Sequence, residues 1–112
     1  MKSKRGDIVI IRFPFSDLSG TKKRPALIIS NHTVNRTGDY LMMQITSKIR
    51  NDNLTFTFNK NDFVNYNELP LQSCVRLHKV FLLNKNLILS KYTAINPQPF
   101  SSIIEKFIIL IK

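Results

Sequence analysis

The chain has 112 residues, a length that fits one domain with a modest hydrophobic core and excludes two. Its 43% hydrophobic content, with eight Phe, excludes a disordered chain despite a formal net charge of +10. The excess of Lys and Arg favours a polyanionic partner, for which nucleic acid, an acidic protein and an anionic membrane surface are the candidates.

Nothing in the sequence points to an oxidising compartment or to a membrane segment. Cys74 is the only cysteine, so no internal disulfide can form. The charged start, MKSKRGD, enters an apolar run too short for a signal peptide, and no stretch approaches the roughly 18 apolar residues of a membrane span. We therefore expect a cytoplasmic protein.

Short apolar runs separated by polar turns predict a mainly β protein. Ile8 to Phe15 is nearly continuously apolar, which indicates a strand buried on both faces, and Ser16 to Arg24 has the composition of a hairpin loop. The further predicted strands are Ala26 to Ile29, Tyr40 to Ile45, the alternating Leu54 to Phe58, and Cys74 to Leu83. Polar loops are predicted between them, including Ser30 to Asp39.

The tail has a different pattern. Pro97 and Pro99 precede Phe100 to Ile111, where apolar residues follow helical spacing. Together the elements predict a small curled sheet or SH3-like β-barrel with a C-terminal helix, forming a single domain over residues 1–112.

Several short motifs then narrow the class of protein to which this chain can belong. Gly6-Asp7 opens the first apolar run, Phe13-Pro14-Phe15 ends it, Ser19-Gly20 follows, and Arg24-Pro25 begins the next strand. Downstream stand Gln44-Ile45-Thr46-Ser47 and the run from Ser73 to Val80. In these motifs, from Gly6 to Phe81, the chain resembles the MazF/PemK/Kid family of toxin ribonucleases.

The resemblance implies a metal-independent and sequence-specific endoribonuclease that cleaves single-stranded RNA and leaves a 2′,3′-cyclic phosphate. It further implies a PemK-like barrel, no cofactor, a homodimer, and inhibition by a small acidic antitoxin. The residues are compatible with this chemistry, since the chain has no metal-ligand spacing of Cys and His, no carboxylate cluster and no glycine-rich phosphate loop.

RNA cleavage without a metal needs a base, an acid and a cation, because the RNA supplies its own 2′-hydroxyl nucleophile. Arg24 suits the cationic role, although the residues alone also fit a solvated arginine beside Lys22 and Lys23. The resemblance makes Arg24 catalytic and adds Thr46 to the active site, with Ser47 as a second candidate hydroxyl.

Arg76 and His78 stand two apart in a predicted strand and so share a face. The resemblance gives the Arg76 position a catalytic role but expects Asp where this chain has His78, so His78 is our candidate proton acceptor. Candidate RNA-binding residues around these four are Lys22, Lys23, Ser47, Lys48, Ser73 and Lys79. Phe63 and Tyr66 are candidates for base stacking.

Two other functions stay open at this point. CcdB-like proteins share the expected fold but act by binding DNA gyrase, and they would not need Arg24, Thr46 and Arg76 around one phosphate. A non-catalytic RNA-binding barrel is the other alternative, and the His78 departure is its best argument.

Overall fold

The structure, a computed structural model, describes residues 3–12 and 22–112. The predicted strand end at Phe13-Pro14-Phe15 and the Ser19-Gly20 turn lie outside the described residues. The strands are β1 (Asp7–Arg12), β2 (Lys23–Ile28), β3 (Asp39–Thr46), β4 (Thr55–Thr57), β5 (Cys74–Asn84) and β6 (Ile88–Ala94). The α-helices are α1 (His32–Asn35) and α2 (Pro97–Ile111), and short 3-10 helices span Lys60–Asp62, Val64–Tyr66 and Lys85–Leu87.

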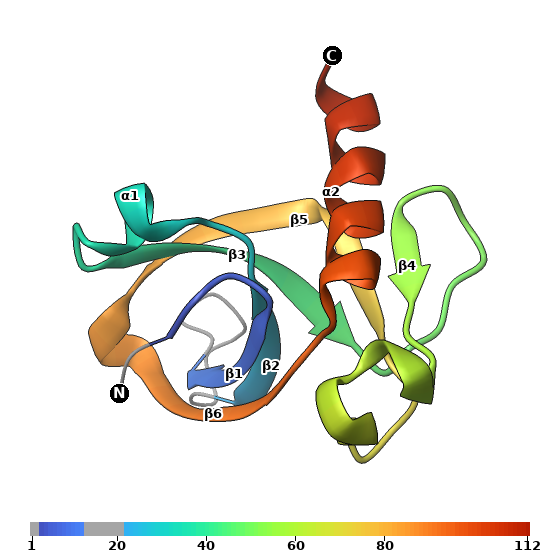
Figure 1. Cartoon of the computed structure of the whole chain (residues 1–112), viewed down its shortest axis with the longest axis horizontal. Helices are drawn as coiled ribbons and strands as arrows, with labels where there is room; N and C mark the ends of the chain where they lie inside the picture. Colours follow the sequence, from blue (N-terminus) through green and yellow to red (C-terminus); the bar gives the residue numbers. More distant parts are fainter. Residues whose placement is uncertain (1–2, 13–21) are drawn as a thin grey trace.

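The strands of the described chain form one antiparallel sheet in the order β4-β5-β3-β2-β1-β6. Figure 1 shows the sheet strongly curled, with β5 on one side of the curl and β6 on the other. β4 and β6 are edges, so the sheet is barrel-like without closing on itself. The predicted fold class, a curled β-sheet with a C-terminal helix, is confirmed.

Both faces of the sheet are covered, which explains why β1 is apolar at consecutive positions. Ile8 belongs to one buried cluster, whereas Val9 and Ile11 belong to a second one. Since neighbouring side chains in a strand point to opposite faces, a strand between two cores needs apolar residues on both. We call the cluster that contains Ile8 the helix-side core, and the cluster that contains Val9 and Ile11 the barrel core.

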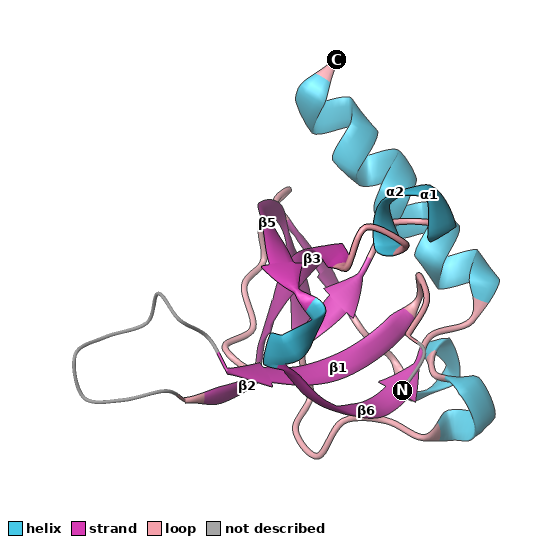
Figure 2. Cartoon of the chain, turned by 90° about the vertical axis from the view of Figure 1, so that its left-hand side faces the viewer, coloured by secondary structure: helices cyan, strands magenta, loops and turns pink. Residues whose placement is uncertain are grey.

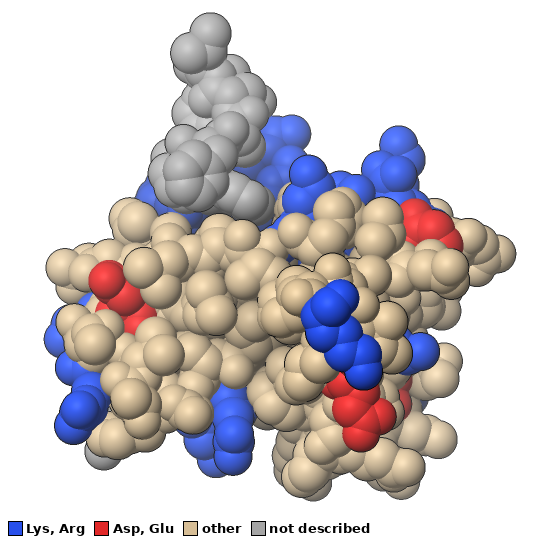
Figure 3. Space-filling model, turned by 90° about the horizontal axis from the view of Figure 1, so that it is seen from above, with Lys and Arg blue, Asp and Glu red and all other residues tan. Residues whose placement is uncertain are grey.

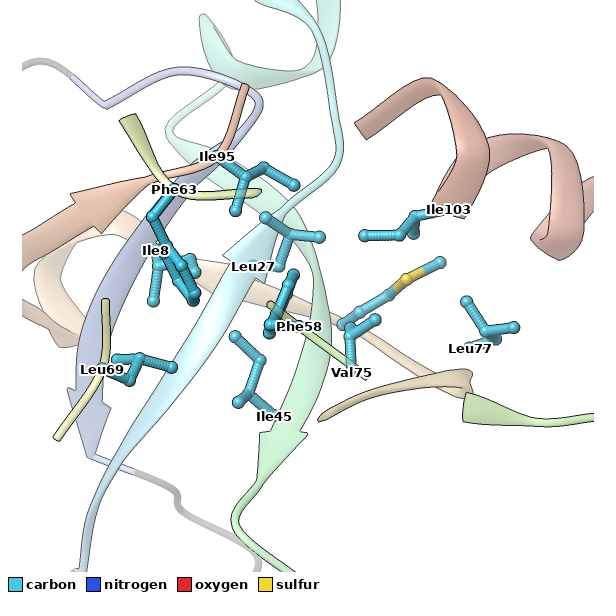
Figure 4. Packing of buried hydrophobic residues seen from close by; sticks show 11 residues of the cluster. Ile8, Leu27, Ile45, Phe58, Phe63, Leu69, Val75, Leu77, Ile95 and Ile103 are labelled. Atoms are coloured by element: carbon cyan, nitrogen blue, oxygen red, sulfur yellow. The ribbon is translucent and has the colours of Figure 1, made fainter. Parts of the chain in front are cut away.

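The N-terminal half of α2 packs against the sheet and completes the helix-side core (Figure 2). In Figure 4, Ile103 points from this helix towards the side chains of the sheet. Ile103 is fully buried, and Phe100 and Phe107 are partly buried against the same cluster. The predicted C-terminal helix is therefore confirmed, but only part of its apolar surface is used inside the chain.

The Gly6-Asp7 motif has a structural role. Gly6 has a φ of +91°, its N–H donates to the Ile28 carbonyl at 2.8 Å, and its carbonyl accepts from the Ile95 N–H at 2.9 Å. The Asp7 carboxylate is 1% exposed; it accepts from the Lys4 N–H at 3.0 Å and lies 3.4 Å from the Lys91 ammonium. The motif thus joins the start of β1 to the end of β2 and to the chain just after β6.

β5 carries an irregularity that matters for the site. Met43 pairs with Val80 and Ile45 pairs with Val75, so two steps along β3 match five steps along β5. The extra residues form a bulge, which reverses the inward and outward alternation of the strand. Leu77 faces the helix-side core before the bulge, whereas Leu83 faces the barrel core after it.

Some of the described elements differ from the sequence-based expectation. The loop predicted from Ser30 to Asp39 contains α1, whose first turn is capped by the Asn31 side chain accepting from the Thr33 N–H. β6 was not predicted, and neither were the short 3-10 helices. None of the helices that the structure describes is long and apolar enough to cross a membrane.

Candidate functional site

Arg24 and Thr46, which come from separate sequence motifs, lie at the same end of neighbouring strands. Ala26 pairs with Gln44 in the β2–β3 ladder, and continuing that register by two residues places Arg24 opposite Thr46. Both side chains then lie on the same side of the sheet as the barrel core. Each is half-buried, at the border between that core and solvent.

Arg76 joins them from the next strand. Thr46 pairs with Cys74 of β5, and Arg76 follows Cys74 by two residues. The intervening Val75 and the following Leu77 point into the helix-side core, so Arg76 points to the opposite side, with Thr46. Three residues predicted to act on one phosphate therefore share one face, at the ends of β2, β3 and β5.

Among the described residues, the hydrogen bonding of Thr46 leaves its hydroxyl proton available. Its Oγ1 accepts from the Lys48 N–H at 3.1 Å, which uses an oxygen lone pair and fixes the turn after β3. Ser47 and Lys48 are exposed in this turn, next to Thr46. A hydroxyl held in this way can donate to a phosphate oxygen.

His78 and Lys79 are exposed and lie within the β5 bulge. Burial alternates from half-buried Arg76 through buried Leu77 to exposed His78, so Arg76 and His78 lie on the same side of the strand. Pairing with β3 resumes at Val80, where the alternation is reversed. His78 thus lies at the solvent-facing end of the row that contains Arg76.

Ser73 has a different environment from the other candidates. It is 6% exposed, and its hydroxyl donates to the Leu71 carbonyl at 2.8 Å, before β5 begins. Ser73 also borders a cavity of about 180 Å³ lined by Phe58 and Phe63, which lies on the side of the helix-side core. Its hydroxyl proton is thus used within the protein.

The site is positively charged without internal compensation. Lys22 and Lys23 are exposed at the start of β2, close in sequence to Arg24. The ion pairs of the described residues join Lys60 to Glu68 and Lys91 to Asp7, and neither reaches the three site residues. Figure 3 shows Lys and Arg side chains gathered along the upper edge of the molecule, with an acidic side chain near one end of it, and further Lys and Arg side chains scattered over the face in view. An anion at Arg24 or Arg76 meets positive charge that no ion pair of the described residues neutralises.

The prediction that Phe63 and Tyr66 stack on RNA bases was wrong for Phe63. Phe63 is 3% exposed and packs against Phe58 with ring centroids 5.2 Å apart, so it belongs to the core and cannot stack on a base. Tyr66 is 63% exposed and borders a shallow groove with Tyr92, away from Arg24, Thr46 and Arg76. Within residues 3–12 and 22–112, no three His, Cys, Asp or Glu side chains gather as metal ligands do.

Sequence reasoning missed Arg50. This residue follows Thr46 by four positions in the basic run Thr46-Ser47-Lys48-Ile49-Arg50, and it is half-buried near the site. Its Nε is buried without a hydrogen-bond partner in the described part of the chain, as is that of Arg76. The alternation of Lys48 and Arg50 after a strand end was the signal that could have drawn attention to it.

Solved structures with the same fold are found among toxins. An endoribonuclease in complex with its cognate antitoxin, from Mycobacterial species, superposes with a TM-score of 0.77 at 19% identity, covering 96% of this chain and 93% of that one. MazF in a MazE-MazF complex from Deinococcus radiodurans gives a TM-score of 0.78 at 17% identity, covering 97% and 95%. The Mycobacterium tuberculosis toxin MazF-mt6 gives 0.70 at 15% identity, covering 90% and 91%. At these identities the likeness establishes the fold.

A comparison with curated proteins gave no match. The family assignment comes from a family model, described as the PemK-like, MazF-like toxin of type II toxin-antitoxin systems, which matches residues 4–111. That match spans nearly the whole chain and includes every candidate site residue. The chain therefore belongs to the PemK-like, MazF-like family of type II toxins.

Proposed function

We propose that this protein is a metal-independent endoribonuclease that cleaves single-stranded RNA at specific sequences and acts as the toxin of a toxin–antitoxin pair. The observation that carries the proposal is the convergence of Arg24, Thr46 and Arg76 on one face, without a carboxylate partner among the described residues. Family membership and the endoribonucleases among the structural neighbours support the same reaction class.

The proposed reaction is a transesterification within the RNA. The 2′-oxygen attacks the adjacent phosphorus and loses its proton to a base, for which His78 is our candidate. The bond from phosphorus to the 5′-oxygen breaks, and that oxygen takes up a proton from solvent. The products are a 2′,3′-cyclic phosphate on one fragment and a 5′-hydroxyl on the other, so no water is consumed and no redox change occurs.

Arg24, Thr46 and Arg76 act on the charge that develops at phosphorus. Guanidinium groups stay cationic and present paired donors that match phosphate oxygens, so two of them stabilise the negatively charged transition state. The Thr46 hydroxyl adds a neutral donor, because its oxygen is already held by the Lys48 N–H. DNA lacks the 2′-hydroxyl and can bind to such a site without reacting.

The charge distribution also fits an acidic antitoxin. A protein of net charge +10 attracts both RNA and an acidic peptide, so one basic edge can explain the substrate and the inhibitor. Relatives of this fold include an endoribonuclease in complex with its cognate antitoxin and MazE-MazF complexes. We propose an acidic antitoxin that covers the face that carries Arg24 and Arg76.

We further propose a homodimer that forms through α2. Ile109 and Ile111 at the end of this helix are 64% and 65% exposed, and Leu82 of β5 is 55% exposed. Two copies of charge +10 repel each other, so a stable contact requires a face with few cations. The last residues of α2, from Phe107 to Ile111, are uncharged, which favours a second copy over an acidic partner there.

The decisive test is to incubate the purified protein with end-labelled RNA in excess EDTA, with DNA of the same sequence alongside. We expect discrete RNA fragments with 2′,3′-cyclic phosphate and 5′-hydroxyl ends, and intact DNA. Cleavage that stops in EDTA and returns with Mg²⁺ would contradict the metal-independent mechanism. Tight RNA binding without cleavage would favour the non-catalytic barrel, and DNA gyrase inhibition without RNA binding would favour the CcdB-like alternative.

A further inference from the structure

Arg50 lies on the same face as Arg76, although the two residues come from different segments. The Thr55 hydroxyl donates to the Arg50 carbonyl at 3.1 Å, and Thr55 is the direct cross-strand partner of Arg76. Side chains of cross-strand partners lie on the same face of a sheet. The Thr55 side chain therefore connects the backbone of Arg50 to the face that carries Arg76.

A second contact shows how the segment from Lys48 to Arg50 runs over this face. The Cys74 thiol points to the Lys48 carbonyl at 3.7 Å, and Cys74 precedes Arg76 by two residues on the same side of β5. The segment thus contacts Cys74 through the Lys48 carbonyl and Thr55 through the Arg50 carbonyl. This double attachment fixes where the Arg50 side chain begins, next to Arg76.

Both guanidinium groups have hydrogen-bond donors without acceptors. The Nε atoms of Arg50 and Arg76 are buried, and neither has a hydrogen-bond partner within residues 3–12 and 22–112. The closest acid in sequence, Asp52, uses its carboxylate to accept from the Leu54 N–H at 3.0 Å. Two neighbouring cations with unpaired donors are unfavourable until an anion supplies acceptors and opposite charge.

The width of the sheet leaves room for a second phosphate next to Arg50. Arg24 lies on β2 and Thr55 lies on β4, which are separated by β3 and β5. Neighbouring strands are about 4.8 Å apart, so the row from Arg24 to Thr55 spans about 14 Å. A row of this length can hold successive phosphates of an RNA strand, with Arg24 at one end and Arg50 at the other.

We propose that Arg50 binds the RNA phosphodiester that neighbours the one to be cleaved, next to Arg76, which contacts the phosphate at the cut. Arg50 is in this arrangement a substrate-positioning residue that contacts the RNA without contacting the reacting atoms. The inference rests on the proposed ribonuclease function, and it adds a second binding site and a direction in which the RNA strand crosses β3, β5 and β4.

The test compares Arg50→Ala and Arg50→Lys with Arg36→Ala, a control that removes the same charge from an exposed position at the end of α1. Affinity is measured on a short RNA spanning the mapped cut, with one 2′-deoxynucleotide at the cut to prevent cleavage. We expect Arg50→Ala to weaken binding about tenfold, in line with the loss of a charged hydrogen bond. The salt dependence of log K should become shallower by about 0.7, the value for one phosphate contact on a single strand. Arg50→Lys should restore the salt slope and part of the affinity.

A double-mutant cycle with modified RNA locates the contact. Each phosphate flanking the cut is replaced in turn by a neutral methylphosphonate. If Arg50 binds one of them, that replacement weakens binding to the wild type but has little further effect on Arg50→Ala. Steady-state cleavage should show a raised KM with a nearly unchanged kcat in Arg50→Ala, which separates this residue from Arg24.

The outcomes distinguish this inference from the proposed function. Additive effects of Arg50→Ala and every methylphosphonate, or RNA affinity equal to that of Arg36→Ala, would overturn the phosphate site at Arg50. Weaker binding to a polyglutamate peptide with unchanged RNA affinity would overturn it as well, since the site would then serve carboxylates. If the wild type does not cleave RNA but Arg50→Ala still lowers the affinity and salt slope on random-sequence RNA, the phosphate site stands and the ribonuclease proposal fails. The Thr55 bond uses the Arg50 backbone, so these substitutions leave it in place.

Discussion

At the scale of single residues, Arg24 allows the most direct test of the proposed chemistry. We expect Arg24→Ala to lower kcat at least about 100-fold, because removing a donor to the transition state typically costs this much. RNA affinity should fall far less, since many other cations share the electrostatic attraction. The measurements are single-turnover cleavage and binding, with Arg36→Ala as the charge-matched control. Equal losses in binding and turnover would make Arg24 a docking residue.

His78 is tested by the pH dependence of cleavage. If its imidazole accepts the 2′-hydroxyl proton, only the neutral ring is active, so the rate should rise with pH. His78→Ala should flatten this limb, and His78→Asp should retain activity with the limb moved to lower pH, because a carboxylate titrates lower. A flat wild-type profile, or an alanine variant as active as wild type, would show that the base lies elsewhere.

Gly6 is tested through stability. Its φ of +91° is a conformation that residues with a Cβ rarely adopt, so Gly6→Ala should lower the free energy of unfolding by about 1–2 kcal/mol. A Cβ at this position would lie 3.7 Å from the Ile95 carbonyl, an ordinary contact, so the cost comes from the backbone and not from a clash. Denaturant titration measures it, and Gly6→Asn should lose less because Asn tolerates positive φ better. An alanine variant as stable as wild type would contradict this account.

At the scale of elements, α2 separates residues that stabilise the fold from residues available for association. Ile109→Lys should give monomers that still fold, because Ile109 is 64% exposed in the single chain and the new charge would be buried only at the contact. Ile103→Ala should instead destabilise the fold by about 2–5 kcal/mol, since Ile103 is fully buried. Light scattering with thermal unfolding distinguishes the two. A monomeric wild type, or a dimeric Ile109→Lys variant, would contradict the α2 interface.

The elements also show what a sequence can and cannot reveal. β1, β3 and β5 were predicted because their apolar runs are long and lie between two cores. β6 was missed because it is a mostly exposed edge strand in which Ser90, Lys91 and Thr93 break any apolar alternation. The motifs singled out Arg24, Thr46 and Arg76, but their common face depends on the register of β2, β3 and β5. Arg50 was missed because its place depends on a bond from Thr55, five residues further along the chain.

At the scale of the whole molecule, net charge controls how the protein meets RNA. We expect the logarithm of the RNA affinity to fall linearly with the logarithm of salt concentration, with a slope of about −0.7 for each phosphate neutralised. With Arg24, Arg50 and Arg76 on one face, the slope should exceed that of a single contact. Fluorescence anisotropy across a salt series measures it. An affinity independent of salt would show that the charge of +10 does not serve nucleic-acid binding.

The pairing of the first strand with the last one has a consequence for protein synthesis. β1 begins at Asp7 and pairs with β6, which ends at Ala94, so this pairing joins segments that lie far apart in the sequence. During synthesis, β1 therefore lacks its outer neighbour until β6 has been translated and has left the ribosome. We infer that the sheet is completed only at that late stage. A nascent chain would until then expose one edge of β1.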